Sequence, residues 1–273
     1  MHPPPRRNTA DATMNSPDRT AQHDAARRFH ALHVRGQPLV LFNAWDAGSA
    51  RAVADAGANA IATGSWSVAA ANGFADGEHV PFALAMDNLR RIVAATTLPV
   101  TVDLESGYGP APDAVAATIA AALDAGAIGC NLEDSFPTDG SLRDVADQVA
   151  RLEAARRVAD AAGVELFINA RTDVFFQAPA GAHDIVMVDA ALERARAYAD
   201  AGASGLFVPG LVADVLIARV IEHSPLPVNI MVMAGASDRM RLAQLGVARI
   251  SHGPGPYRGA MRWLTQAARE AMA

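Results

Sequence analysis

The composition of the 273-residue chain excludes several classes of protein. Its hydrophobic content of 51% is enough to bury roughly three quarters of the unfolded surface, as one large domain or two small ones. The single cysteine, Cys130, rules out a disulfide framework and a cysteine-based zinc site. The net charge of −6 argues against nucleic-acid binding. All 23 cationic residues are arginine, so no lysine can form a Schiff base.

The N-terminal region predicts a tail without a targeting function. Residues 1–22 are rich in Pro, Asn, Asp and Thr, which is typical of a disordered segment. They contain no apolar signal stretch, and no run elsewhere approaches the roughly 20 uncharged residues of a membrane span. We therefore expect a cytoplasmic protein with no membrane partner, whose residues 23–273 form the folded domain, with a leading helix near 20–35.

The remaining chain repeats one pattern of helix end, glycine and short apolar strand. The pattern is clearest in ADAGANAIATGS (54–65), LDAGAIGCNLEDS (123–135) and ADAGASGLFVPG (199–210). Strands are predicted near 39–43, 59–63, 99–104, 128–133, 165–171, 205–208, 227–232 and 247–251. Helices are predicted near 47–56, 84–96, 112–125, 144–162, 188–201, 213–223, 237–245 and 257–271. Eight such units predict an α/β fold, a single (β/α)8 TIM-type barrel, and the absence of a G-x-G-x-x-G after any strand disfavours a doubly wound sheet.

Carboxylates follow two neighbouring predicted strands. In TVDLESGYGP, alternation places Asp103 and Glu105 on the same face, and GCNLEDS places Glu133 on the corresponding face of the next strand. Three acids without clustered histidines are hard oxygen ligands that favour Mg2+ or Mn2+. The alternative is that Asp103 and Glu105 are solvated acids or helix caps. Cys130 faces the helices and is interpreted as a core residue.

Other strand ends carry groups suited to an anionic substrate. Arg171, in ELFINARTD, points inward and can bind a carboxylate. After the second strand, Thr63 offers a hydroxyl, and the N–H groups of Gly64 and Ser65 can cradle an anion, although a plain turn is nearly as good a reading. The loop NGFADGEHVP carries Asp76, which by itself is most often a turn former.

These motifs together resemble the isocitrate lyase and phosphoenolpyruvate mutase superfamily. FNAWDAGSARAVADAG, TGSWSVAAANGFADG, DLESGYG, NLEDS and ARTD stand in that family's order, over about residues 25–260. The resemblance implies Mg2+ approached most directly by Asp103, with Glu105 and Glu133 holding its waters. It further implies that Thr63, Gly64 and Ser65 bind the substrate carboxylate.

In addition, the resemblance implies that Arg171 contacts the substrate and that Asp76 lies near the reacting group. The reaction it implies is the cleavage or formation of a C–C or P–C bond next to a small 2-oxo acid, through an enolate held on the metal. Relatives exchange the final helix between neighbours, and GPYRGAMRWLTQAAREAMA is richer in apolar side chains than one outer face requires. We expect a homodimer or homotetramer.

The departures from the family indicate which branch is favoured. Glu105 stands where the family usually has aspartate, and DSFPTDGSLRDVADQ lacks the K-[KR]-C-G-H loop of the lyases. Gly210 replaces the lyase glutamate after strand six, whereas Asn229 matches a polar position of the lyase pocket. A decarboxylase, hydrolase or phosphonomutase is therefore favoured over an isocitrate or methylisocitrate lyase. Two alternatives stay open: a phosphate-binding barrel of another type, suggested by the glycine loops at 234–237 and 251–259, and a 2-oxo-acid-binding homologue without catalysis.

Overall fold

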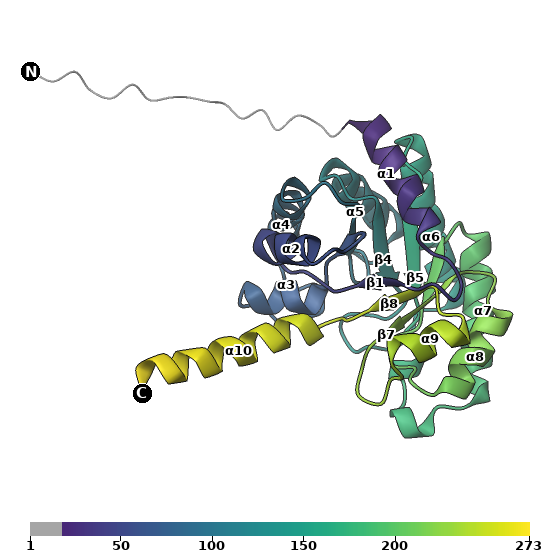
Figure 1. The fold of residues 1–273 in the computed structure, drawn as a ribbon. Helices are drawn as coiled ribbons and strands as arrows, with labels where there is room; N and C mark the ends of the chain where they lie inside the picture. The colour runs from purple at the N-terminus through teal and green to yellow at the C-terminus, as the bar shows by residue number, and fades with distance from the viewer. Residues whose placement is uncertain (1–17) are drawn as a thin grey trace, which may run out of the picture.

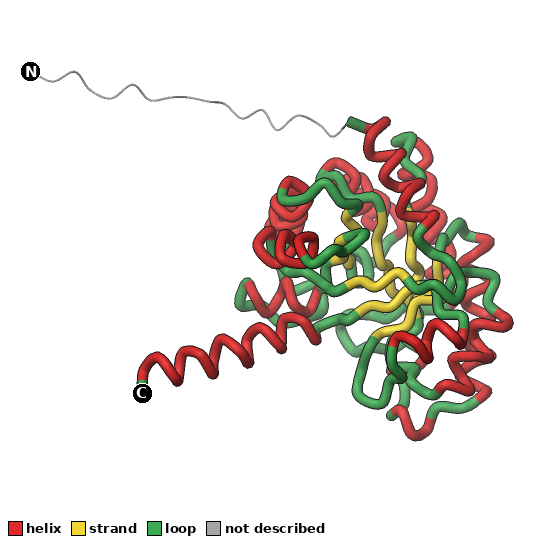
Figure 2. Tube along the Cα trace, in the orientation of Figure 1, coloured by secondary structure: helices red, strands yellow, loops and turns green. Residues whose placement is uncertain are grey.

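The computed structural model describes residues 18–273 and contains an eight-stranded, all-parallel sheet that curls into a nearly closed barrel. The strand order is β1-β8-β7-β6-β5-β4-β3-β2, so each strand but the first two pairs with its neighbours in the chain. Figure 1 and Figure 2 show the strands at the centre and the helices around them. The predicted TIM-type barrel is confirmed.

The strands and helices lie close to their predicted positions. The strands are β1 Leu39–Leu41, β2 Ile61–Ala62, β3 Val100–Asp103, β4 Gly129–Glu133, β5 Phe167–Arg171, β6 Gly205–Phe207, β7 Val228–Met231 and β8 Arg249–Ser251. The helices are α1 Arg19–Ala31, α2 Ala47–Asp55, α3 Ser65–Ala71, α4 Phe82–Ala94, α5 Pro112–Asp124, α6 Val145–Ala161, α7 Ile185–Asp200, α8 Asp214–His223, α9 Arg239–Leu245 and α10 Gly255–Met272. Short 3-10 turns span Val174–Phe176 and Ala180–Ala182. None of the helices within residues 18–273 is both long and apolar enough to cross a membrane.

The repeated glycines end helices where the chain must turn back into the barrel. Gly126, which follows α5, has φ of +95°, a conformation that costs other L-residues about 1 kcal/mol or more. A Cβ on it would lie 2.8 Å from Cγ1 of Val93 on the neighbouring helix. Glycine at this point therefore permits both the turn and the close packing of α4 against the loop before β4.

The barrel has one weak seam, between β1 and β2. These strands share no ladder and are joined past their ends by a bridge between Ala44 and Thr63. The buried side chain of Asn43 reinforces the seam, because its Nδ2 donates to the Thr63 carbonyl at 2.8 Å while its Oδ1 accepts the N–H groups of His252 (3.0 Å) and Gly253 (2.9 Å). One amide thus connects the ends of β1, β2 and β8 at the barrel mouth, which is the end of the barrel where the strands finish.

The hydrophobic core divides into two clusters. The first is built mainly on β1 to β5 with helices α1 to α6, and it includes Phe29, Leu104 and Phe167. The second is built on β6 to β8 with α7 to α9, and it includes Phe175 and Ile230. The boundary falls just after β5, so the two arcs of the barrel have separate apolar support.

The predicted end of the N-terminal tail at residue 22 is wrong, because α1 begins at Arg19. Asp18 caps the helix by accepting the N–H groups of Thr20 and Ala21, at 2.9 and 3.4 Å. The buried side chain of Gln22 donates to the carbonyls of Leu123 (2.9 Å) and Ala127 (2.7 Å), which fastens the helix to the barrel. Residues 1–17 of the predicted tail lie outside the described residues.

We expect His33, just after α1, to make the protein sensitive to acid. Its Nδ1 donates to the Phe29 carbonyl at 2.9 Å, its ring stacks on Phe167 at 3.9 Å, and its buried Nε2 has no partner within residues 18–273. Burial, aided by Arg249, lowers the pKa of His33 to about 3. Between pH 6.5 and 3 the His33 ring is protonated in the unfolded chain but not in the folded protein. The free energy of unfolding is therefore undiminished by this group above pH 6.5 and decreases as the pH falls below that value.

The measurement is urea unfolding of the parent and of His33→Gln across that range of pH. The free energy of unfolding of the parent should fall more steeply, by up to about 1.4 kcal/mol per pH unit. Parallel curves for the two proteins would show that the His33 ring titrates normally in the folded state.

Candidate functional site

Asp103 ends β3 and is held at the barrel mouth by the segment that follows β2. Its Oδ2 accepts both the backbone N–H of Ser65 at 3.0 Å and the Ser65 hydroxyl at 2.9 Å. Its own N–H donates to Oγ1 of Thr63 at 2.9 Å. Its Oδ1 is buried and has no partner within residues 18–273. Gly64 is the N-cap of α3, and the Ser65 donors that were expected to bind an anionic substrate bind the Asp103 carboxylate, so the predicted anion cradle stays a prediction.

Glu105 lies beyond the end of β3 and does not continue its alternation. Its backbone is left-handed, with φ of +53°, and its Oε2 accepts the N–H groups of Gly77 at 2.8 Å and Glu78 at 2.7 Å. Burial and then the charge of Asp103 raise the pKa of Glu105 to about 7, against the lowering effect of these N–H donors. Glu105 therefore faces Asp103 while it binds the loop that carries Asp76.

Asp76 approaches the same centre from the loop between α3 and α4. Burial and the nearby carboxylate of Asp103 raise the pKa of Asp76, whereas Arg171 lowers it. Asp76 also adds to the repulsion that raises the pKa of Glu105. The structure therefore brings the three carboxylates of Asp76, Asp103 and Glu105 within electrostatic range of one another.

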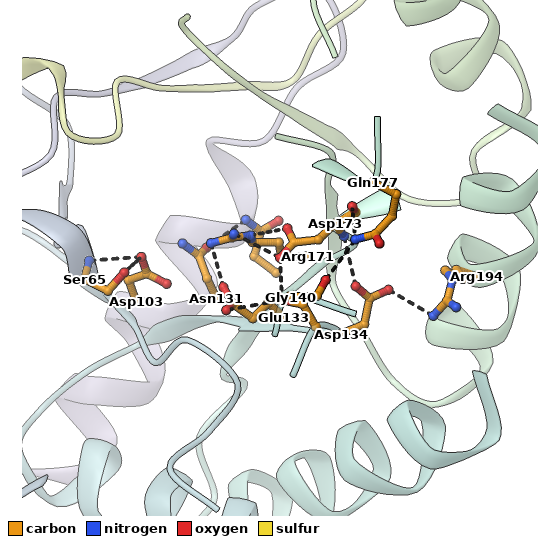
Figure 3. Close-up of polar contacts among 12 residues, drawn as sticks. Ser65, Asp103, Asn131, Glu133, Asp134, Gly140, Arg171, Asp173, Gln177 and Arg194 are labelled. Carbon is orange, nitrogen blue, oxygen red and sulfur yellow. Dashed lines mark hydrogen bonds and ion pairs between the residues drawn. The ribbon is translucent and has the colours of Figure 1, made fainter. Parts of the chain in front are cut away.

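Arg171, at the end of β5, is held between two carboxylates (Figure 3). Its Nη1 lies 2.6 Å from Oε2 of Glu133, and its Nε and Nη2 lie 2.6 and 3.0 Å from the two oxygens of Asp173. Burial raises the pKa of Glu133 well above its usual range, and Arg171 opposes that shift. Burial would lower the pKa of Arg171, but Glu133 and Asp173 outweigh it and keep the guanidinium charged.

Sequence reasoning missed the residues behind this arginine. Asp173 accepts the Ser135 hydroxyl at 2.6 Å and donates its N–H to Asp134 at 2.9 Å. Asp134 accepts in turn from Arg194 (3.1 Å) and from the Tyr198 hydroxyl (2.8 Å) on α7. Figure 3 shows this row running from the mouth to α7. The motifs NLEDS and ARTD contain Asp134 and Asp173, but alternation alone gives neither its partner.

Two further residues singled out in the sequence are Asn229, from the family resemblance, and Cys130, from strand alternation. Asn229 on β7 is buried, and its Nδ2 donates to the Ser251 hydroxyl on β8 at 3.1 Å. Cys130 is buried in the core, and burial raises the pKa of its thiol to about 12, as expected of a packing residue. His252 lies in the loop after β8, and burial lowers its pKa.

The three predicted metal-site acids do not converge into one ligand cluster. Within residues 18–273 no group of three or more His, Cys, Asp or Glu side chains is arranged to hold a metal ion. The physical reason is that two of the three have other partners: Glu105 binds loop N–H groups and Glu133 pairs with Arg171. Even so, the unpartnered Oδ1 of Asp103 and the raised pKa values of Asp76 and Glu105 indicate uncompensated negative charge, which fits a hard cation.

A parallel barrel whose strand ends carry carboxylates and an arginine around one mouth is typical of barrel enzymes that act on small anionic molecules. Over residues 29–272 the sequence matches the family model described as phosphoenolpyruvate phosphomutase, and the chain belongs to this family within the phosphoenolpyruvate mutase and isocitrate lyase superfamily. A crystal structure from Burkholderia cenocepacia, described as that of a "putative phosphonomutase", is 61% identical with a TM-score of 0.90, over 92% of this chain and 99% of that chain.

The other relatives differ in what their names say. An uncharacterized protein of Mycobacterium tuberculosis is 36% identical over 241 residues, 88% of this chain and 87% of that protein. An oxaloacetate decarboxylase of a Bradyrhizobium strain is 32% identical over 171 residues, 60% of this chain and 54% of that enzyme. Further relatives are named 2-methylisocitrate lyase. A phosphonopyruvate hydrolase solved with oxalate and Mg2+, at 20% identity and a TM-score of 0.77 over 91% of this chain and 88% of that chain, shares the fold.

Proposed function

We propose that this protein is a Mg2+-dependent enzyme that makes or breaks a C–C or P–C bond next to a small 2-oxo acid. The observation that carries the proposal is Asp103, whose buried Oδ1 has no partner in the described part of the chain and lies among carboxylates at the mouth of a barrel of this family. Relatives are named for lyase and decarboxylase reactions, and the name of the oxaloacetate decarboxylase supports a small 2-oxo acid as the substrate class. The family match removes the alternative of a phosphate-binding barrel of another type.

The residues present suit a divalent cation, with Mn2+ as the alternative to Mg2+. Asp103 would hold the ion most directly, while Asp76, Glu105 and Glu133 would hold its waters. When bound, the ion supplies a Lewis acid that stabilises negative charge developing on the oxygens of a 2-oxo acid. It would also relieve the repulsion that raises the pKa values of Asp76 and Glu105.

The protein's own groups bind and orient the substrate in this proposal. Arg171 stays charged and is held by Glu133 and Asp173, so its guanidinium is fixed before the substrate arrives. Thr63, Gly64 and Ser65 border the other side of Asp103, where the start of α3 favours a carboxylate. Asn229, paired with Ser251, presents an amide from β7 on the far side of the barrel.

The test is a substrate panel of oxaloacetate, phosphonopyruvate and methylisocitrate, run with Mg2+ and with a chelator, together with calorimetry of oxalate. We expect turnover of one small 2-oxo acid or phosphonate, and oxalate binding only when Mg2+ is present. Tight oxalate binding without turnover of any substrate would favour the non-catalytic homologue instead. Equal oxalate affinity after chelation would refute the metal site.

Asp76→Ala should remove activity without unfolding the protein. Asp76 as a whole residue is exposed on a loop with few core contacts, although its carboxylate lies near enough to Asp103 for partial burial to raise its pKa, so the unfolding temperature should stay within about 2 °C of the parent. Turnover should fall by about a hundredfold or more if Asp76 acts near the reacting group. Asp55→Ala, which changes an exposed aspartate at the end of α2, is the matched control, and the measurements are steady-state kinetics and thermal unfolding. A large loss of stability with activity intact would count against this role.

The last helix supports the prediction of a homodimer or homotetramer. Figure 1 shows α10 running away from the barrel, and only Pro256 among its residues is buried. Trp263, Leu264 and Met272 are 70%, 52% and 83% exposed, which is costly for an isolated chain in water. A largely apolar groove of about 660 Å3 lies beside the start of α10 and is lined by residues of β1 and α2.

We expect light scattering at micromolar protein to give the mass of a dimer or tetramer. Trp263→Arg should shift the mass toward the monomer, because it places a charge on the surface that we expect a neighbouring copy to cover. Arg219→Ala on α8 serves as a surface control. A parent protein that is monomeric at this concentration would contradict the prediction.

A further inference from the structure

Two loops at the barrel mouth are joined by reciprocal hydrogen bonds, in which a glutamate carboxylate of each loop accepts from the other. One is the Asp76 loop, residues 75–79, and the other is the Glu105 turn, residues 104–108. Oε2 of Glu105 accepts the N–H groups of Gly77 and Glu78, at 2.8 and 2.7 Å. In return, Oε1 of Glu78 accepts the Ser106 hydroxyl and the N–H of Tyr108, both at 2.7 Å. Each loop therefore supplies the carboxylate that satisfies the backbone of the other.

Backbone strain is concentrated at this reciprocal contact. The non-glycine residues with positive φ in the described part of the chain are Glu78 (63°), Glu105 (53°) and Tyr108 (56°). All three belong to the two loops, and each such conformation costs on the order of 1 kcal/mol. Strained residues persist where the surrounding contacts determine the backbone, and functional sites are where they gather.

The two loops are anchored very differently. Arg151, which is buried on α6, donates Nη1 to the carbonyls of Gly109 (2.9 Å) and Pro110 (2.6 Å) and Nη2 to that of Ser106. Thr118 on α5 donates to the Gly107 carbonyl at 2.9 Å. The Glu105 turn is therefore fixed to the body of the barrel by two helices.

Within residues 18–273 no helix side chain donates to the backbone carbonyls of the Asp76 loop as Arg151 and Thr118 do to the Glu105 turn. Inside the loop, the His79 ring forms a hydrogen bond with the Asp76 carbonyl at 2.9 Å. The hydrogen bonds that Gly77 and Glu78 make with the Glu105 turn therefore join this loop to a more firmly anchored part of the barrel.

We propose that Glu78 is a positioning residue: its carboxylate and that of Glu105 form a clasp that fixes the Asp76 loop against the Glu105 turn and so sets where Asp76 stands at the site. The inference rests on the proposed function in one respect, that Asp76 acts near the reacting group. The clasp itself requires no particular reaction, because it is formed by the chain alone.

The variants Glu78→Ala and Glu78→Gln separate the clasp from a general effect of charge. Both hydrogen bonds from the Glu105 turn go to one oxygen of Glu78, and the amide of glutamine keeps one such acceptor. Alanine removes the acceptor altogether. Ser106→Ala is a milder second variant, since it deletes one of the two bonds, and Glu193→Ala, which changes an exposed glutamate on α7, is the matched control.

The measurement is native-state hydrogen exchange of the full-length, metal-free protein, with steady-state kinetics and thermal unfolding alongside. In Glu78→Ala the N–H groups of residues 77, 78 and 108 should exchange ~10- to 100-fold faster, which is the effect of losing hydrogen bonds to a charged acceptor. Ser106→Ala should give a smaller increase, and Glu78→Gln and Glu193→Ala should stay within about threefold of the parent. The rate kcat should follow the same order while the unfolding temperature changes little.

Unchanged exchange in Glu78→Ala would overturn the clasp, and so would equal acceleration in the alanine and glutamine variants. If Glu78→Ala does not fold, Ser106→Ala decides by the same criterion. Hydrogen exchange is measured without substrate, so it tests the clasp independently of any reaction. A protein that turns over no 2-oxo acid would refute the proposed function, and the exchange rates would still test the clasp. Faster exchange with kcat unchanged would show that the clasp does not position Asp76, which refutes the inference.

Discussion

Asp103→Asn should lower kcat/KM on the best substrate by more than about a hundredfold, and it should also abolish Mg2+-dependent oxalate binding. The carboxylate has one oxygen committed to Ser65 and one buried oxygen without a partner within residues 18–273. An amide of the same shape either turns its NH2 toward the Ser65 donors or presents it where a cation would sit. Either orientation removes the charge that makes this position a hard ligand.

Asp113→Asn, an equivalent change at an exposed position in the first turn of α5, should leave kinetics and binding unchanged. Thermal unfolding of both variants shows whether any loss comes from misfolding. If Asp103→Asn keeps metal-dependent binding and more than a tenth of the parental kcat/KM, another residue must hold the ion.

The second large effect concerns the reaction: cleavage of isocitrate or methylisocitrate should be slower than lyase rates by ~10²- to 10⁴-fold, the usual contribution of a positioned proton donor. The lyase loop with its cysteine is absent here, and Cys130 is buried with its pKa raised to about 12. The Ser135 hydroxyl, the nearest alternative after β4, already donates to Asp173 at 2.6 Å. It is also a far weaker acid than a thiol.

Gly210, at the position of the lyase glutamate, also disfavours lyase activity. Gly210 has φ of +92°, and a Cβ there would lie 3.0 Å from the Phe175 carbonyl oxygen and 3.1 Å from the Phe176 ring. Any side chain at this position is strained and crowded, so a glutamate cannot be restored by one substitution. The aromatic side chain of Phe176, whose ring centroid lies 5.6 Å from the Arg171 guanidinium carbon, borders the mouth at this point.

The panel measurement is the release of succinate with glyoxylate or pyruvate, compared with decarboxylation of oxaloacetate and P–C cleavage of phosphonopyruvate under the same conditions. Some curated relatives are named 2-methylisocitrate lyase, which makes the comparison informative. Robust succinate release at lyase-like rates would show that the missing loop and the glycine do not decide the branch.

The fold was predictable because its signals are local and repeated. Most units end a helix at a glycine, α4 and α8 being exceptions that end before Thr or Ser and Pro, and each begins a strand with apolar residues, so eight strands could be placed within two residues of their observed ends. Helix α3 was missed because its seven residues begin close after β2, and its start was interpreted as an anion-binding segment or a plain turn. The boundary at residue 22 failed because the capping by Asp18 and the long-range bonds of Gln22 are not visible in local composition.

The positions of several candidate residues at the strand ends were predictable, whereas their pairings were not. Their roles in a functional site stay a prediction. Strand alternation correctly put Asp103, Glu133 and Arg171 at one mouth, since each ends a parallel strand. It failed at Glu105, where a left-handed residue turns the chain away from the strand direction. Partners such as Glu78, which holds the Glu105 turn, and Asp134, which accepts the N–H of Asp173, come from other loops, and tertiary contacts of this kind leave no periodic trace in the sequence.

The division of the core bears on how such a barrel can diversify. The carboxylates and Arg171 rest on the arc from β3 to β5, whereas Gly210 and Asn229 rest on the arc from β6 to β8, which has its own apolar cluster. Substitutions far from the boundary of the two clusters should combine almost additively, whereas those near it, where Leu226 packs against both clusters and Gly210 approaches Phe176, should not. Substitutions on the β6–β8 arc away from that boundary can therefore change substrate preference while the proposed catalytic groups on the other arc keep their positions. An exchange of the β6–β8 half between relatives is the chimera that this architecture should tolerate best.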